Sequence, residues 1–345
     1  MVKRHFPLAI VPLLLLLAVA TAAVEAAKVG ICYGRLGDNL PPPATAVQLI
    51  TSNNITKVRL FDPDTPTLRA FAGTGVELMV GIPNDVLPSL AAGTAANAAR
   101  WLQSNVFDSV PAAQVRYLAA GNEVLFGDAS YAPHLVPALW NLHRALQAMG
   151  LDGGIKLSTP HAASVLATSY PPSGGSFAAS VLPTMRPLLE FLAQTGAPFM
   201  ANVYPFFAHV GDPAGVPISY ALFGPDAPVV QDGGLAYTNL FDATVDAFVA
   251  AMETEGFPGI AVAVAETGWA TAGGEAATPK KAAAFNGNVV SRAVQGVGTP
   301  RRPGVAVEVF LFGLFDEDGK PGEEYERHFG VFHHDGRKAY DISFV

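Results

Sequence analysis

The sequence predicts a single (β/α)8 barrel, the TIM-barrel fold class. Apolar, strand-like runs alternate with helix-like segments along the chain, and no long Pro-, Gly- or Ser-rich stretch divides them. Eight such units follow one another within residues 28–345, a length that suits a barrel of this kind. A doubly wound open sheet is the alternative. It requires a glycine-rich nucleotide loop after an early strand, and Gly34-Arg-Leu-Gly37 does not have that pattern.

The seventh predicted strand is the most distinctive. It runs through small or β-branched apolar residues from Ile260 to Ala265 and ends at the carboxylate of Glu266. A continuous apolar run is typical of a strand that is buried on both faces in a parallel sheet. Strand alternation places Val262 and Val264 on the same face as Glu266. A salt bridge to a nearby Lys or Arg is one explanation for a glutamate there, and catalysis is the other.

The remaining elements are predicted from the same two periodicities. The other strands are expected at residues 28–33, 57–61, 76–80, 114–120, 155–158, 198–204 and 305–312. Helices are expected at residues 41–53, 65–73, about 92–106, 133–149, 184–195, 240–255 and 279–295. The last helix is weakly marked, so residues 319–332 are expected to form a loop with one or two helical turns.

Residues 1–27 have the pattern of a secretory signal peptide. Lys3 and Arg4 precede an apolar segment at residues 6–20, and small residues follow up to Ala27. The apolar segment is too short to span a bilayer. The sequence therefore predicts two parts, a leader at 1–27 and a catalytic barrel at 28–345. It also predicts a secreted protein of the extracellular space or cell wall, with the vacuole as the other destination.

Composition limits the classes of partner. The formal net charge of −8 argues against nucleic acid and against an anionic membrane, whereas a neutral ligand is indifferent to it. Cys32 is the only cysteine, so no intrachain disulfide can form, and a monomer is expected. Asn54-Ile55-Thr56 is a glycosylation sequon and indicates a surface position.

Carboxylates at the ends of predicted strands indicate the chemistry. Glu123 follows the fourth strand, Glu266 ends the seventh, and Glu317 follows the eighth. In a barrel these ends lie on one face, and two carboxylates there suit glycoside hydrolysis, in which one donates a proton and the other attacks. Asn122 and Glu123 are consecutive, so a bend at Gly121 is needed to bring both to the mouth. Taken alone, Asn122 is better explained as a turn residue.

Aromatic residues at strand ends are candidates for stacking on sugar rings. The candidates are Tyr33, Tyr204, Phe206, Phe207 and Trp269, and Phe207 is the first that we would assign to the core instead. His333 and His334 lack further spaced ligands, so no metal site and no cofactor are expected.

Nine motifs in order give the chain a resemblance to a known family. They are Gly30-Ile-Cys-Tyr-Gly34, Asn39-Leu-Pro41, Val58-Arg-Leu-Phe-Asp-Pro63, the run from Phe71 to Asp85, Gly121-Asn-Glu123, Asn202-Val-Tyr-Pro205, Glu266-Thr-Gly-Trp269, Phe315-Asp-Glu317 and Glu326-Arg-His-Phe-Gly330. The chain resembles the plant endo-β-1,3-glucanases of glycoside hydrolase family 17 over nearly the whole mature length.

The resemblance implies roles for individual residues. Glu123 matches the general acid/base and Glu266 the nucleophile of a retaining mechanism, and Asn122 matches the asparagine that bonds the sugar 2-hydroxyl. Further residues are expected to contact a β-1,3-glucan substrate: Tyr33, Asn202, Tyr204, Phe206, Trp269, Glu317, Lys320 and Glu326. Without the resemblance, Lys320 is best explained as a solvated surface lysine.

The chain departs from the family pattern at three positions, and alternatives remain open. It has Phe61 and Phe206 where relatives often have Tyr, and Ala270 where they often have Pro. Action on mixed-linkage β-1,3;1,4-glucan and glucosyl transfer from the same intermediate are alternatives within the enzymes. An inactive, secreted glucan-binding protein is the alternative from another class, and the presence of both glutamates argues against it.

Overall fold

The computed structural model describes residues 29–126 and 129–344. The predicted leader lies outside the described residues. Among the helices that are described, none is long and apolar enough to cross a membrane.

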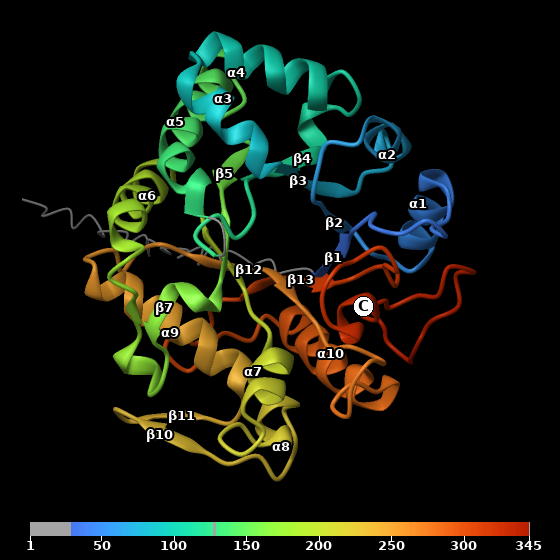
Figure 1. Ribbon diagram of the computed structural model, residues 1–345, viewed down its shortest axis with the longest axis vertical. Coiled ribbons are helices and arrows are strands. Elements are labelled where there is room, and N and C mark those ends of the chain that lie inside the picture. The colour runs from blue at the N-terminus through green and yellow to red at the C-terminus, as the bar shows by residue number, and fades with distance from the viewer. Residues whose placement is uncertain (1–28, 127–128, 345) are drawn as a thin grey trace, which may run out of the picture.

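Parallel strands form the barrel wall (Figure 1). Along the sheet the order is β5-β4-β3-β2-β1-β13-β12-β9-β6. The strands are β1 (Val29–Tyr33), β2 (Lys57–Leu60), β3 (Glu77–Ile82), β4 (Val115–Ala120), β5 (Lys156–Ser158), β6 (Pro160–Ala162), β9 (Phe199–Asn202), β12 (Val262–Thr267) and β13 (Glu308–Phe312). The predicted (β/α)8 barrel is thus confirmed, and each predicted strand overlaps an observed one.

The nine strands correspond to eight barrel positions because the fifth strand is split. β5 pairs with β4, whereas β6 pairs with β9. Only Thr159 separates the two segments along the chain. The chain therefore passes from one edge of the sheet to the other through a single residue, which closes the barrel.

Helices surround the sheet (Figure 1), and the first of the two α-helices between β3 and β4 was not predicted. They are α1 (Pro43–Ser52), α2 (Thr65–Phe71), α3 (Leu87–Ala92), α4 (Ala95–Leu102), α5 (Ala132–Ala148), α6 (Leu182–Thr195), α9 (Leu240–Thr254) and α10 (Pro279–Val294). The helix predicted at 92–106 begins later, because the Thr94 side chain caps it through Asn97, and it continues as a π-helix, Gln103–Phe107. Within residues 319–332, Glu324–Arg327 forms one 3-10 turn, as predicted.

Two long connections contain elements that the sequence did not predict. After β6 come the paired strands β7 (Leu166–Thr168) and β8 (Ser176–Phe177). After β9 come α7 (Pro205–Gly211), α8 (Ile218–Ala221) and the hairpin of β10 (Val230–Asp232) and β11 (Leu235–Tyr237). Connections of such length are too long for simple βα loops, and the second one has a small core of its own around Tyr220 and Tyr237.

The amino-terminal end of the barrel is closed by charged side chains. Lys57 on β2 forms an ion pair with Glu308 on β13, and the Tyr117 hydroxyl on β4 donates to Glu308 at 2.6 Å. Asn54 precedes β2 at this same end and is exposed, which confirms the surface position predicted for the sequon. The carboxyl ends of the strands lie at the other end, where the barrel is open.

Candidate active site

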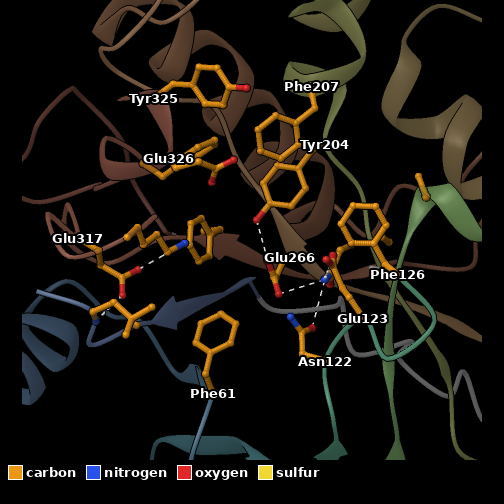
Figure 2. A pocket seen from close by; sticks show the side chains of 18 of the residues that line it. Phe61, Asn122, Glu123, Phe126, Tyr204, Phe207, Glu266, Glu317, Tyr325 and Glu326 are labelled. Atoms are coloured by element: carbon orange, nitrogen blue, oxygen red, sulfur yellow. Dashed lines mark hydrogen bonds and ion pairs between the residues drawn. The ribbon is translucent and has the colours of Figure 1, made fainter. Parts of the chain in front are cut away.

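A cavity of about 950 Å³ lies at the carboxyl ends of the strands (Figure 2). Its charged and amide lining is contributed by residues far apart in the sequence: Arg35, Asp62, Asn122, Glu123, Asn202, Glu266, Glu317, Lys320 and Glu326. Its aromatic lining consists of Phe61, Phe126, Tyr204, Phe207, Phe312, Tyr325 and Phe329. The barrel therefore brings the predicted carboxylates together, as strand-end positions imply.

Glu266 receives donors from three other elements. Its Oε1 lies 2.9 Å from Arg59 Nη1 and accepts from Asn202 Nδ2 at 3.1 Å, while Oε2 accepts from the Tyr204 hydroxyl at 2.8 Å. The register of β12 against β9 shifts between Val264 and Glu266, which places Glu266 opposite Asn202. Glu266 thus has the salt bridge that one explanation required, but it also lines the cavity, so the two explanations are not exclusive.

Arg59 is the main feature that the sequence reasoning missed. Its side chain is buried on β2 and lies over the Phe61 ring, 4.6 Å from the centroid. Besides Glu266, it donates to the Asn122 side-chain oxygen at 2.9 Å and to the Ala265 carbonyl at 3.0 Å. The available signal was an arginine between two apolar strand residues, Val58 and Leu60, since Arg is almost never fully buried unpaired.

The bend expected at Gly121 is present. β4 ends at Ala120, and both Gly121 (φ 70°) and Glu123 (φ 50°) adopt left-handed backbone conformations. Asn84 holds the turn, because its side chain accepts from the Asn122 N–H at 2.8 Å and donates to the Asn122 carbonyl at 3.1 Å. As a result, the side chains of Asn122 and Glu123 both line the cavity.

Asn202 fixes the separation of the two glutamates. Its Nδ2 donates to Oε1 of Glu123 at 2.7 Å and to Oε1 of Glu266 at 3.1 Å. The distance between the two Oε1 atoms therefore cannot exceed the sum of the two hydrogen-bond lengths. Burial raises the pKa of Glu123, and the negative charge of Glu266 raises it further. The surroundings of Glu123 thus favour its protonated form more than water does.

A second charged group lies across the cavity. Glu317 is 4% exposed, and its Oε1 accepts from the Leu36 N–H at 2.8 Å. Lys320 Nζ lies 3.8 Å from Glu317 Oε2 and 3.7 Å above the Phe312 ring, so Lys320 is not a solvated surface lysine. Burial raises the pKa values of both Glu317 and Glu326, and the Lys320 charge opposes the shift in each.

Three predicted sugar platforms are wrong. Tyr33, Phe206 and Trp269 are 1%, 0% and 0% exposed, and none of them lines the cavity. Trp269 donates its Nε1–H to the Ala276 carbonyl at 2.9 Å, and the Phe206 ring packs against it edge-on. Phe207, the candidate that we would first have assigned to the core, does line the cavity. Position at a strand end does not determine which face a side chain takes.

The histidine pair has no metal-site geometry. Among the described residues, no group of three or more His, Cys, Asp or Glu could hold a metal ion. His334 instead contacts the Asp316 carbonyl through Nε2 at 3.0 Å.

Comparison with known proteins identifies the family. Residues 29–344 match the model of glycosyl hydrolases family 17. The chain belongs to this family. A glucan endo-1,3-beta-glucosidase of Vitis vinifera is 42% identical over 343 residues, which cover 99% of this chain and 98% of the relative. The acidic isoform of glucan endo-1,3-beta-glucosidase from Zea mays is 46% identical over 332 residues, covering 96% of each chain.

Solved structures agree with the family assignment and with the barrel. A β-1,3-glucanase and allergen of Cryptomeria japonica pollen is 43% identical, with a TM-score of 0.88, and covers 92% of this chain and 99% of its own. One of two plant β-glucan endohydrolases with distinct substrate specificities is 41% identical, with a TM-score of 0.85, and covers 91% and 99%. A β-1,3-glucanosyltransferase of Rhizomucor miehei, 19% identical with a TM-score of 0.58, shares the fold.

Replacing Arg59 is expected to destabilise the protein strongly. In the Arg59→Met variant the buried carboxylate of Glu266 loses its cation, which costs about 3–5 kcal/mol in buried pairs of this kind. Urea unfolding measures this loss of stability.

Arg35→Met is the matched control. Arg35 also lines the cavity, but its ion pair with Asp64 is about one-third exposed, so its loss should cost about 1 kcal/mol or less. Equal unfolding midpoints for the two variants would contradict the role assigned to Arg59.

Proposed function

We propose that this chain is an endo-acting β-1,3-glucan hydrolase that works by double displacement. The observation that carries the proposal is the pair of glutamates bridged by one amide, Asn202, at the mouth of the barrel. Retaining glycosidases need carboxyl groups about 5–5.5 Å apart, whereas inverting enzymes need about 6.5–9.5 Å to seat a water. Because both carboxyl groups bond to the same Asn202 nitrogen, their short separation fits a retaining enzyme. The names of the family relatives support β-1,3-glucan as the substrate.

In the first step Glu266 is the nucleophile. Its carboxylate forms a bond to the anomeric carbon while the bond from that carbon to the glycosidic oxygen breaks. Glu123 donates its proton to this oxygen, so the leaving sugar departs as an alcohol. The Tyr204 hydroxyl and Arg59 hold the Glu266 carboxylate in place for the attack.

In the second step Glu123 acts as the base. Once Glu266 is an ester it carries no charge, so its like charge no longer raises the pKa of Glu123. The carboxylate of Glu123 then takes a proton from water, whose oxygen attacks the anomeric carbon and releases Glu266. The product keeps the β configuration because two inversions occur.

Secretion and a monomeric state belong to the same proposal. The pattern of residues 1–27 supports passage through the secretory route. The one cysteine, Cys32, is buried in the barrel, so the chain from residue 28 onward should fold without an oxidant. Cell-wall β-1,3-glucan, either from a plant or from a fungus, would then be the accessible substrate.

Hydrolysis of laminarin is the direct test. We expect the purified protein to release shorter oligosaccharides from internal positions, with β-configured reducing ends in proton NMR spectra recorded before mutarotation. Lichenan, a mixed-linkage glucan, should be cleaved more slowly. An initial α-anomer would mean that the two glutamates do not form the reacting pair, and binding of laminarin without products would favour the inactive glucan-binding alternative.

Azide should distinguish the roles of the two glutamates. In Glu266→Ala, azide can occupy the space of the nucleophile and attack once, so an activated β-glucoside should yield the α-glucosyl azide. In Glu123→Ala, azide attacks the ester on Glu266 instead and should yield the β-glucosyl azide. The products are identified by NMR and mass spectrometry. The opposite pairing of variants and products would reverse the assignment.

The pKa of Glu123 should depend on Glu266. In Glu266→Gln the pKa of Glu123 is expected to fall, because a like charge is removed, but to stay above its ordinary value, because burial is the larger cause. Titration of side-chain carboxyl carbons by NMR, with Glu123→Gln to assign the signal, measures this. In the wild type, kcat/KM should fall as the pH rises through the pKa of Glu123, since the first step needs its proton. An unchanged pKa would exclude the electrostatic coupling.

A further inference from the structure

Phe126 presents an exposed aromatic ring to the cavity. Of the described residues that line it, Leu36 and Phe126 are the large apolar side chains that are more than half exposed, at 57% and 58%. The other aromatic rings of the cavity pack on one another. For example, the ring centroids of Tyr204 and Phe207 are 4.8 Å apart, and those of Phe312 and Phe329 are 5.5 Å apart. A flat apolar face is therefore available at Phe126 for a ligand.

The ring is held beside the catalytic acid. The Phe126 N–H donates to the Glu123 carbonyl at 2.8 Å, so the two residues belong to one turn. Figure 2 shows the Phe126 ring next to Glu123, on the opposite side of Glu266 from Glu317 and Glu326. The Glu123 N–H donates to the Pro160 carbonyl of β6 at 2.9 Å, and the cavity-lining residues after β6, Ala163 and Ser164, are small. Small side chains there leave space next to the ring.

Proton donation by Glu123 indicates that the leaving group occupies the space beside the Phe126 ring. The proton of Glu123 goes to the glycosidic oxygen, so the sugar attached to that oxygen departs on the side of Glu123. A β-glucosyl ring carries axial C–H groups on its faces and hydroxyl groups at its edge, so it can lie flat on an aromatic ring while its hydroxyls stay hydrated. Phe126 is placed to receive such a face.

The charges of the cavity indicate a neutral sugar. Five carboxyl groups line it, from Asp62, Glu123, Glu266, Glu317 and Glu326, against the basic side chains of Arg35 and Lys320. An acidic sugar such as a uronic acid would meet repulsion. A neutral glucosyl residue would not.

We infer that Phe126 is the platform of a leaving-group subsite that binds one β-glucosyl residue of the chain through its C–H face. This inference rests on the proposed function, and it adds a residue that determines which substrates are cleaved efficiently. Substrates with a sugar on the leaving side gain from the subsite. Substrates that lack one do not.

Two substrates with the same glycone separate the subsite from the chemistry. A β-1,3-linked gluco-oligosaccharide has a sugar leaving group, whereas β-laminaribiosyl fluoride has fluoride, which cannot stack. In Phe126→Ala we expect kcat/KM for the oligosaccharide to fall about tenfold, the loss of roughly one apolar contact of this size. The value for the fluoride should stay within about twofold of the wild type, because the Glu266 attack is untouched. Phe126→Tyr should retain the wild-type ratio of the two values.

Leu36→Ala is the matched control, because it removes a side chain of similar exposure whose backbone N–H bonds Glu317 rather than the turn of Glu123. It should leave the ratio of the two kcat/KM values unchanged. An equal loss on both substrates in Phe126→Ala, or no loss on either, would overturn the subsite. Failure of the wild type to cleave the oligosaccharide at all would instead overturn the proposed function.

Discussion

The buried guanidinium of Arg59 is the group on which the geometry of the site depends. From β2 it reaches Glu266 at the end of β12 and Asn122 after β4, and it lies 3.5 Å from the Asn202 side-chain oxygen on β9. Parallel strands in a barrel splay at their ends, and one planar, multiply donating cation ties several of these ends together. Compared with an apolar pair of the same shape, the ion pair adds little net free energy to folding, because desolvation offsets the attraction. Arg59 nevertheless allows only one arrangement of its acceptors.

The fold was predictable because buried parallel strands are rich in apolar, β-branched residues. Most of the barrel strands are short, largely apolar runs, and the helices between them show a different period. The split at Thr159 and the elements in residues 163–181 and 203–239 were not predicted, because these segments are short and follow neither period strictly. Capping side chains moved the ends of some helices by a few residues from their predicted positions, as Thr94 does for α4.

Site residues could be predicted from the sequence only where burying their side chains costs free energy. A carboxylate at the end of a buried strand needs a reason, so Glu123 and Glu266 stood out, and both line the cavity. An aromatic ring can be placed in the core or in a groove at little cost, and so Phe206 and Phe207, which are adjacent, could not be assigned to the correct faces. Arg59 was overlooked because its partners come from three distant segments and are visible only once the barrel has closed.

The backbone of Glu123 has a consequence for how such a sequence can drift. A glutamate at φ 50° occupies a conformation that costs about 1–2 kcal/mol for a residue with a Cβ and that glycine or asparagine adopts more easily. Selection for folding alone would therefore tend to replace Glu123. In the proposed mechanism, the fold bears this backbone strain in order to hold the proton donor at the mouth of the barrel.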